Sequence, residues 1–415
     1  MPPRTIIYTG KGGVGKTSVA AACALRSAAS KLRTLVMSTD PAHSLSDSLQ
    51  MPVGGEPTAV GPCLWAQEIS AQEQLEEHWA GVQDWLGDIL MQRGVNRISA
   101  EELAVPPGLD ELFSLLALKR HHEEGHYDVI VVDCAPTGET LRLLSFPDVA
   151  RWWVERVVPA QGQLMAAARP LVRAALDVAL PGEQVLDDVQ RLLANLVALH
   201  EILADRSRVS VRLVMTPDRM VIQEARRTFT YLNLYGYLTD AVVVNRVFPS
   251  EVDGYFQAWR RVQQEHLGEV QAAFSPVPVL QAPYFDSEVV GRAMLERLGR
   301  EVFGHVEPTA LLHDRLAHQL RVDDDGATLR LDLPFASRGD ISLKKIGREL
   351  VVRVDAHKRM VTLPPALSDS RPTGACFRDG SLVVTFPKRQ KRGARDAVAG
   401  SPPPASQPAG VAGDV

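Results

Sequence analysis

Cysteine is scarce in this sequence, with four in 415 residues. Cys23, Cys63, Cys134 and Cys376 lie far apart, and no two of them have the Cys-x-x-Cys spacing. Disulfide frameworks and thiolate zinc sites both need clustered cysteines. We therefore interpret the four as small buried hydrophobic residues, and the sequence indicates neither a disulfide-stabilised domain nor a thiolate metal site.

Long apolar runs and an excess of one charge are also lacking. No stretch approaches the roughly 18 apolar residues that span a bilayer, and the first residues have no signal-peptide pattern, so we expect a cytoplasmic protein with no evident membrane partner. Forty-five basic and 50 acidic residues give a net charge of -5, which offers no general reason for nucleic-acid binding. Hydrophobic residues make up 45% of the chain, as in ordinary globular proteins, and the length favours two or three domains.

The first 305 residues alternate between β-rich and helical patterns, which predicts an α/β domain with a doubly wound, mostly parallel sheet. The expected strands share apolar, β-rich stretches and lie at 5–9, 32–40, 127–133, 209–215 and 241–245. Helical patterns fill 16–30 and 221–234. Two further segments, about 70–125 and 149–204, are helical without clear strands, so we expect them to form an inserted helical subdomain.

The remainder of the chain changes character twice. We expect a linker helix over 306–326, and then alternating patterns at 328–334, 349–355 and 381–386 predict a compact all-β sandwich over 327–388. The final segment, 389–415, begins with basic residues and continues rich in proline, alanine and glycine, which indicates a disordered tail.

One glycine-rich motif carries the chemistry. It satisfies the pattern G-x-x-x-x-G-K-[ST] between an apolar strand and a helix, which is the context that a phosphate-binding loop requires. Its backbone amides would hold phosphates, Lys16 would contact the β- and γ-phosphates, and the Thr17 hydroxyl would ligate Mg²⁺. We therefore predict ATP and Mg²⁺ as ligands. The predicted ATP-binding segment comprises Gly10, Lys11, Gly12, Gly13, Val14, Gly15, Lys16, Thr17 and Ser18.

A second lysine, Lys11, directly follows the first glycine, and an ordinary phosphate-binding loop has no need of it. The segment Lys-Gly-Gly-Val-Gly-Lys-Thr resembles the deviant loop of the nitrogenase iron protein and septum-site ATPase class. That resemblance implies a lysine that reaches across a dimer interface to the nucleotide of the partner. There it would offset the charge on the transferring phosphoryl group, as an arginine finger does.

Two more stretches, 38–47 and 133–142, resemble the switch I and switch II motifs of the ATPases that drive the arsenite pump and target tail-anchored proteins. By this resemblance Asp40 would orient or deprotonate the attacking water, and Asp133 would hold the Mg²⁺ shell. The expected positions of Asp40 and Asp133 support these roles, because carboxylates that end parallel strands lie at the ligand-binding edge of such sheets. The resemblance also implies nucleotide contacts from Pro136 and Gly138 in switch II and from Asn245, the adenine-contacting asparagine.

The sequence departs from that family in three respects. Position 139 is a glutamate where many members have a histidine, so γ-phosphate sensing would differ in detail. No cysteine lies between Phe248 and Phe285, so the zinc clasp between subunits of the eukaryotic targeting members is lacking. The arsenite-pump ATPase carries two phosphate-binding loops in tandem whereas this chain has one, which implies a homodimer through the nucleotide face.

The β unit resembles the α-crystallin (small heat-shock protein) domain that some members carry at their C-terminus, through Leu331-Asp-Leu-Pro334, Ile341-Ser-Leu and Glu349-Leu-Val-Val. An unrelated sandwich that serves for packing is the alternative. We predict a homodimeric ATPase that handles a client, such as an apolar helix or peptide. The energising subunit of an anion or arsenite efflux pump and a septum-site type positioning ATPase are the other hypotheses.

Overall fold

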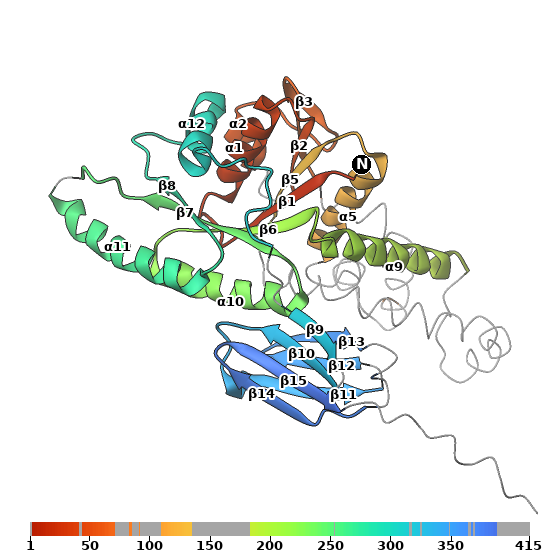
Figure 1. Cartoon of the computed structure of the whole chain (residues 1–415). Helices are drawn as coiled ribbons and strands as arrows, with labels where there is room; N and C mark the ends of the chain where they lie inside the picture. Colours follow the sequence, from red (N-terminus) through yellow and green to blue (C-terminus); the bar gives the residue numbers. More distant parts are fainter. Residues whose placement is uncertain are drawn as a thin grey trace, which may run out of the picture.

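The structure is a computed structural model in which the central sheet and the C-terminal β domain are both described (Figure 1). The described residues are 2–40, 44–70, 83–84, 91, 109–134, 183–252, 254–314, 318–323, 326–347, 349–363, 367 and 370–387. Most of the predicted helical insertion and the predicted tail therefore lie outside the described residues. Among the described residues, no helix combines the length and the apolar character that crossing a membrane requires.

An eight-stranded sheet organises the first domain, with strand order β3-β4-β2-β5-β1-β6-β7-β8. All neighbours are parallel except β3 and β4. The predicted doubly wound, mostly parallel sheet is thus confirmed, while β3 and β4 extend it at one end and β8 at the other, which we did not anticipate. The strands are β1 (Arg4–Thr9), β2 (Thr34–Ser38), β3 (Thr58–Gly61), β4 (Leu64–Glu68), β5 (Val129–Asp133), β6 (Val209–Met215), β7 (Thr239–Val247) and β8 (Val279–Pro283).

Helices cover both faces of this sheet, which explains why the central strands are apolar on both sides (Figure 1). On one face pack α1 (Lys16–Ala29), α2 (Ser44–Leu49) and α12 (Gly291–Phe303). The other face is covered by α5 (Leu109–Glu124), α9 (Glu183–Ala204), α10 (Arg219–Tyr235) and the C-terminal end of α11 (Tyr255–Phe274). Each face has its own apolar core, so the strands that carry the phosphate-binding loop are held rigidly.

The C-terminal domain consists of two antiparallel sheets around one apolar core, which confirms the predicted all-β unit. Alternate residues of β10, β12 and β15, such as Leu329, Val352 and Val384, point into this core. One sheet has the order β14-β15-β10-β9 and the other β11-β12-β13. The strands are β9 (His318–Asp323), β10 (Gly326–Asp332), β11 (Ile341–Ile346), β12 (Glu349–Val354), β13 (His357–Thr362), β14 (Gly374–Arg378) and β15 (Ser381–Pro387).

The expected linker helix over 306–326 is wrong. The described part of this segment is not helical up to residue 314, and β9 follows at His318–Asp323, paired with β10. Tertiary contacts explain the difference. Arg212 and Asp240 form a fully buried ion pair of 3.1 Å between Nε and Oδ1. The same two side chains bind the linker backbone, because Arg212 donates to the carbonyl of Ala310 and Asp240 accepts from the amide of Leu312.

The β domain packs on the C-terminal half of α10. Leu234 of this helix belongs to the core of the β domain, and the ring of Tyr231 stacks on His357 with centroids 3.6 Å apart. Tyr231 also donates a hydrogen bond to Asp355, and Tyr235 lies in hydrogen-bond contact with His357. The helix α10 therefore belongs to the ATPase domain and also forms the packing contact with the β domain.

Candidate active site

The phosphate-binding loop joins β1 to α1, and three of its glycines, Gly10, Gly13 and Gly15, have positive φ angles that other residues rarely adopt. Gly10 has φ +151°, and a Cβ at this position would lie 2.0 Å from the carbonyl oxygen of Val214 on β6. Gly15 has φ +91°, and its Cβ would lie 2.4 Å from Nδ2 of Asn245. The loop is therefore wedged between neighbouring strands, and its path depends on glycine at both positions.

The two lysines of the loop lie in different environments. Lys16 begins α1 with only 5% of its surface exposed, and its Nζ donates to the carbonyl of Lys11 over 3.5 Å. The side chain of Lys11 is 41% exposed, and its Nζ lies 3.4 Å from Oε2 of Glu224 on α10. Lys16 thus belongs to the interior of the loop, whereas Lys11 lies on its outer rim.

Thr17 and Asp133 form the polar centre below the loop. The Thr17 hydroxyl donates to Oδ2 of Asp133 over 2.5 Å and lies 3.0 Å from the hydroxyl of Ser44. Asp133 is fully buried, and its other oxygen, Oδ1, has no hydrogen-bond partner among the described residues. Burial raises the pKa of this carboxyl to about 6. A buried carboxylate oxygen without a partner beside two hydroxyls is a donor set that suits Mg²⁺, which takes oxygen ligands and keeps several waters.

Asp40 follows the end of β2, next to the strand that ends in Asp133. Ser38 of β2 is in register with Asp133 of β5, and the amide of Thr39 donates to the carbonyl of Asp133 over 2.9 Å. The charge of Asp40 adds to the effect of burial on the Asp133 pKa, so the two carboxyls lie near one another. The structure thus brings together Lys16, Thr17, Asp40 and Asp133, as predicted from the sequence.

Asn245 lies near the end of β7 and is almost completely buried. Its Nδ2 donates to the carbonyl of Val14 over 2.9 Å, and its Oδ1 accepts from the amide of Arg246. Asn245 therefore supports the loop directly in this conformation. The contact with adenine stays a prediction.

The other predicted nucleotide-binding residues lie in the loop or in switch II. Gly12 and Gly13 are exposed, Val14 is buried and Ser18 lies in the first turn of α1, whereas Pro136, Gly138 and Glu139 lie outside the described residues.

A pocket of about 560 Å³ opens beside the loop, a size typical of small-ligand sites. One wall is the loop itself from Lys11 to Val14, and the opposite wall is aromatic. Sequence reasoning missed the aromatic wall and also Ser44. Phe248 and Tyr284 directly follow the ends of β7 and β8, so their position at the ligand-binding edge of a parallel sheet was the available signal. The aromatic wall consists of Phe248, Phe256, Trp259 and Tyr284.

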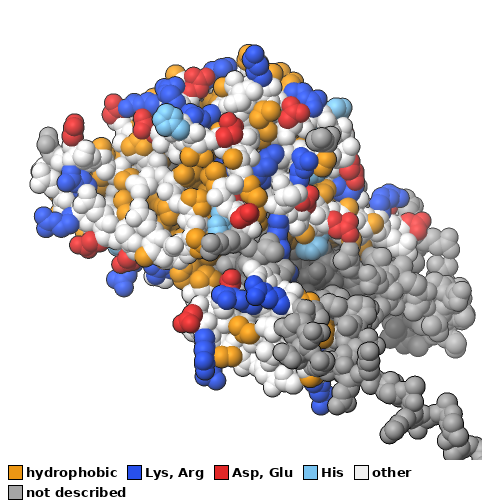
Figure 2. All heavy atoms as spheres, in the orientation of Figure 1, with side chains coloured by type: hydrophobic (Ala, Val, Ile, Leu, Met, Phe, Trp, Pro, Cys, Tyr) orange, Lys and Arg blue, Asp and Glu red, His pale blue; other side chains and the backbone are white. Residues whose placement is uncertain are grey.

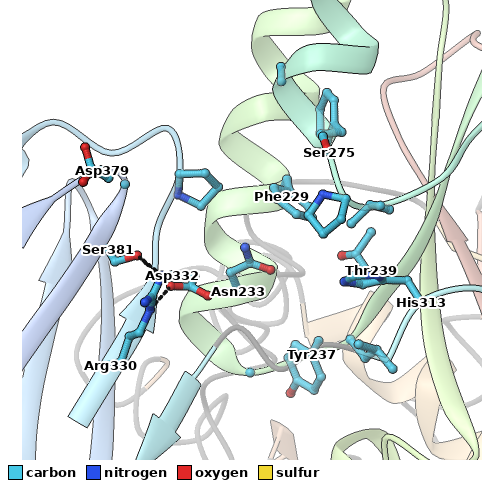
Figure 3. Close-up of a pocket in the computed structure, with 18 of the residues that line it drawn as sticks. Phe229, Asn233, Tyr237, Thr239, Ser275, His313, Arg330, Asp332, Asp379 and Ser381 are labelled. Atoms are coloured by element: carbon cyan, nitrogen blue, oxygen red, sulfur yellow. Dashed lines mark hydrogen bonds and ion pairs between the residues drawn. The ribbon is translucent and has the colours of Figure 1, made fainter. Parts of the chain in front are cut away.

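A second pocket, of about 300 Å³, lies between the two domains (Figure 3). On the β-domain side, Arg330 and Ser381 both bond to Asp332. Asn233 and Thr239 face it from the ATPase side. None of the residues lining this pocket belongs to the phosphate-binding loop. The site that combines a phosphate cradle, a cation ligand set and a carboxylate is therefore the one at the loop.

Comparison with known proteins gives a consistent picture. The profile of the family described as anion-transporting ATPase matches residues 3–304, and the profile described as the HSP20-like domain found in ArsA matches residues 324–386. A protein of Chlorobaculum tepidum named as an arsenical pump-driving ATPase is 40% identical over 387 residues, covering 92% of this chain and 96% of its own length.

Two further relatives are similar over most of their length. A second protein named as an arsenical pump-driving ATPase, from Aquifex aeolicus, is 35% identical over 392 residues, covering 92% of this chain and 99% of its own. The ATPase get3 of Aspergillus terreus is 31% identical over 309 residues, covering 71% of this chain and 88% of its own.

Proposed function

Because the chain belongs to the anion-transporting ATPase family and is an ATP hydrolase, we propose that two copies close around two ATP molecules and use hydrolysis to control a client. The phosphates would lie in the cradle of the loop at the amino end of α1, where backbone amides and the helix dipole favour anions. Lys16 would stay with the β- and γ-phosphates of its own subunit.

Mg²⁺, when bound, would neutralise charge on the β- and γ-phosphates. Thr17 and Asp133 would hold it, with Ser44 within reach of the same position. Asp133 must be ionised for this role. Its pKa of about 6 leaves it ionised at neutral pH, although burial makes that form costly without a cation nearby. Asp40, at the end of the neighbouring strand, would orient the attacking water and accept its proton.

The observation that carries the dimer proposal is the outward position of Lys11. This lysine lies on the rim of the loop, where its ammonium group pairs with the partly exposed Glu224, whereas Lys16 is buried. A cation on the rim is well placed to meet a nucleotide brought by a second copy. It would supply positive charge in trans to the phosphoryl group during transfer, an effect worth about 10³ to 10⁵ in rate where an arginine does so.

Mixing two inactive variants tests this proposal. Lys11→Ala and Asp40→Asn chains each lose most turnover when pure. In a mixed dimer the Lys11→Ala subunit keeps its own Asp40 and receives Lys11 from its partner. An equal mixture should therefore regain about a quarter of the wild-type rate, since half of the dimers are mixed and one of their two sites works. A mixture as inactive as its components would show that Lys11 acts on its own subunit.

The handling of a client is supported by the position of the β domain. It packs on α10, the same helix whose Glu224 contacts Lys11, so a change at the loop has a direct route to the β domain. A client with an apolar segment would suit a domain of the HSP20-like type. Full-length Asp40→Asn protein with ATP should retain peptides bearing an apolar helix and release them with ADP. Equal retention in both nucleotides would contradict this proposal.

A second candidate function, the energising of an arsenical pump, is favoured by the names of two relatives. The cysteines do not support an arsenite site of converging thiolates, since Cys23 and Cys134 are buried and Cys376 is exposed on β14. Capture of an integral-membrane channel by the ATP-bound Asp40→Asn variant would favour the pump over the client hypothesis.

A further inference from the structure

A buried hydroxyl at the junction of the two domains has no hydrogen-bond partner among the described residues. It belongs to Thr239, the first residue of β7, whose surface is 3% exposed. Thr239 lines the pocket of about 300 Å³ between the domains, and Figure 3 shows its side chain facing that space. A hydroxyl taken out of water costs free energy unless another polar group replaces the lost hydrogen bonds. A molecule bound in the pocket would supply such a group.

A side-chain amide lies at the same pocket. Asn233 belongs to the last turn of α10 and is 7% exposed. Figure 3 shows Asn233 and Thr239 both directed into the space between the domains. An asparagine amide carries a donor and an acceptor side by side, and a threonine hydroxyl can act as either. The two side chains together therefore suit a ligand that presents a donor and an acceptor along one edge.

The wall behind these two groups is apolar and aromatic. Phe229 of α10 and Phe274 of α11 are buried, and their rings meet edge to face with centroids 5.3 Å apart. Pro276 and Val277 continue the wall along the turn that precedes β8. Figure 2 shows Lys and Arg side chains on the β domain along its junction with the ATPase domain, in contrast to this apolar wall. A flat ring would bury its surface against the two phenylalanines.

The guanidinium and carboxylate groups that line the pocket either have partners already or lie in solvent. Arg330 and Asp332 form an ion pair of 2.9 Å on β10. Nε of Arg206 donates to the carbonyl of Gly236 over 2.9 Å, and Asp379 is exposed. An ionised ligand would have to displace these contacts to find a counter-charge, whereas an uncharged molecule would leave them in place. The pocket therefore favours an uncharged ligand.

We propose that this pocket binds a small, uncharged, planar molecule that carries an amide edge. Asn233 would pair with the donor and acceptor of that edge, Thr239 would add a hydrogen bond, and the ring would lie against Phe229 and Phe274. A volume of about 300 Å³ is at the lower end of the range for small-ligand sites, which suits a single ring. Because both domains line the pocket, the bound molecule would stabilise their docking.

Benzamide is the probe that tests this site, since it combines an uncharged amide with one flat ring. Saturation-transfer NMR on the full-length chain without nucleotide measures its dissociation constant, which we expect in the millimolar range or below. N,N-Dimethylbenzamide lacks the N–H donor and benzoate carries a charge, so both should bind at least about tenfold more weakly. Asn233→Leu should weaken the binding of benzamide by a similar factor.

The stability of the ligand-free protein gives a second readout. Thr239→Val replaces the unpaired hydroxyl by a methyl group of the same shape, so it should raise the midpoint of thermal unfolding while it weakens the binding of benzamide. Thr230→Val is the matched control. Thr230 is equally buried and lies on α10 away from the pocket lining, but its hydroxyl donates to the carbonyl of Arg226 over 3.1 Å. This control should not raise the midpoint and should bind benzamide as wild type does.

Several outcomes would overturn the proposal. Wild-type protein that does not bind millimolar benzamide has no such site, and tighter binding of benzoate would show that the arginines select an anion. Unchanged affinity in Asn233→Leu would place the probe elsewhere. If that variant does not fold, Asn233→Asp keeps the shape of the side chain, removes the amide donor and gives the same test. A Thr239→Val protein that is less stable than wild type without ligand would mean that water already satisfies the hydroxyl.

Discussion

Lys11 and Glu224 form an ion pair of 3.4 Å at the edge of the phosphate-binding loop, so the lysine that we assign to a partner's nucleotide is held here by its own subunit. Both side chains are more than a third exposed, and such pairs contribute at most about 1 kcal/mol. Glu224→Gln should therefore release Lys11 at little cost. We expect ATP-driven dimerisation to tighten by up to about fivefold, as measured by sedimentation.

Salt provides the check on this prediction. Because exposed ion pairs are screened, the advantage of Glu224→Gln over wild type should shrink as ionic strength rises. Arg226→Gln is the control, since Arg226 lies on α10 as Glu224 does but pairs with Glu269 of α11. A Glu224→Gln protein that dimerises more weakly than wild type would mean that Glu224 supports the closed state instead.

The buried carboxyl of Asp133 predicts an unusual dependence of stability on pH. Its pKa is about 6 in the folded chain and 3.8 in its ordinary state. Between these values the folded chain binds a proton that the unfolded chain does not, so this group destabilises the fold at pH 7 and less so as the pH falls towards 4. Asp133→Asn should raise the free energy of unfolding of the ligand-free protein at pH 7 by about 2 to 3 kcal/mol and abolish Mg²⁺-dependent turnover.

Denaturant titrations from pH 4.5 to 7.5 would measure this effect. Asp128→Asn is the control of opposite sign, because hydrogen bonds from Arg33 lower the pKa of Asp128 and that carboxylate supports the fold above its ordinary pKa. If Asp133→Asn is less stable than wild type at pH 7 without ligand, the carboxylate makes favourable contacts that outweigh its burial.

The parts of the site that sequence reasoning found are those with a local signature. The loop, Asp40 and Asp133 each sit directly after an apolar β run, and the parallel register of β1, β2 and β5 is what brings them together. Ser44, Glu224 and the two aromatic residues that α11 contributes to the pocket beside the loop, Phe256 and Trp259, have no such signature. Glu224 meets Lys11 only because α10 packs beside the loop, and α10 is far along the chain.

The linker over 306–326 also depends on contacts that are distant in the sequence, and for that reason its structure was predicted wrongly. The segment 306–326 has no strong hydrophobic pattern. Its backbone is held by hydrogen bonds to two side chains of the sheet, Arg212 and Asp240. Local propensity cannot foresee a buried ion pair on β6 and β7, so a helix was a reasonable expectation and an incorrect one. The α-crystallin-like unit, by contrast, was predictable because the segments that form β10, β12 and β15 alternate in the sequence and glycines stand between them.

The glycines of the loop should differ sharply in their tolerance of alanine. At Gly10 a Cβ would overlap the backbone oxygen of Val214, which cannot move without displacing β6. Gly10→Ala should therefore lower the free energy of unfolding by more than about 3 kcal/mol. At Gly12 a Cβ meets nothing within 4 Å, so Gly12→Ala should stay within about 0.5 kcal/mol of wild type.

Chemical denaturation of the two variants without nucleotide measures this difference apart from any effect on phosphate binding. Similar losses at both positions would indicate that the loop adopts another path in solution.

Docking of the β domain on α10 should depend mainly on Leu234. This side chain is fully buried in the core of the β domain although it belongs to the ATPase domain. Leu234→Ala removes that contact and should cost about 2 to 5 kcal/mol, as large-to-small changes in cores do. Tyr231→Phe is the matched control, since it keeps the ring on His357 and loses only the hydrogen bond to Asp355, worth about 1 kcal/mol.

Calorimetry of full-length protein should show two separated unfolding transitions for Leu234→Ala, whereas the Tyr231→Phe control should keep the wild-type profile. Hydrogen exchange should rise in the C-terminal half of α10, because the β domain no longer protects it. Unchanged exchange there would mean that the polar contacts of Tyr231 and Tyr235 hold the two domains together without Leu234.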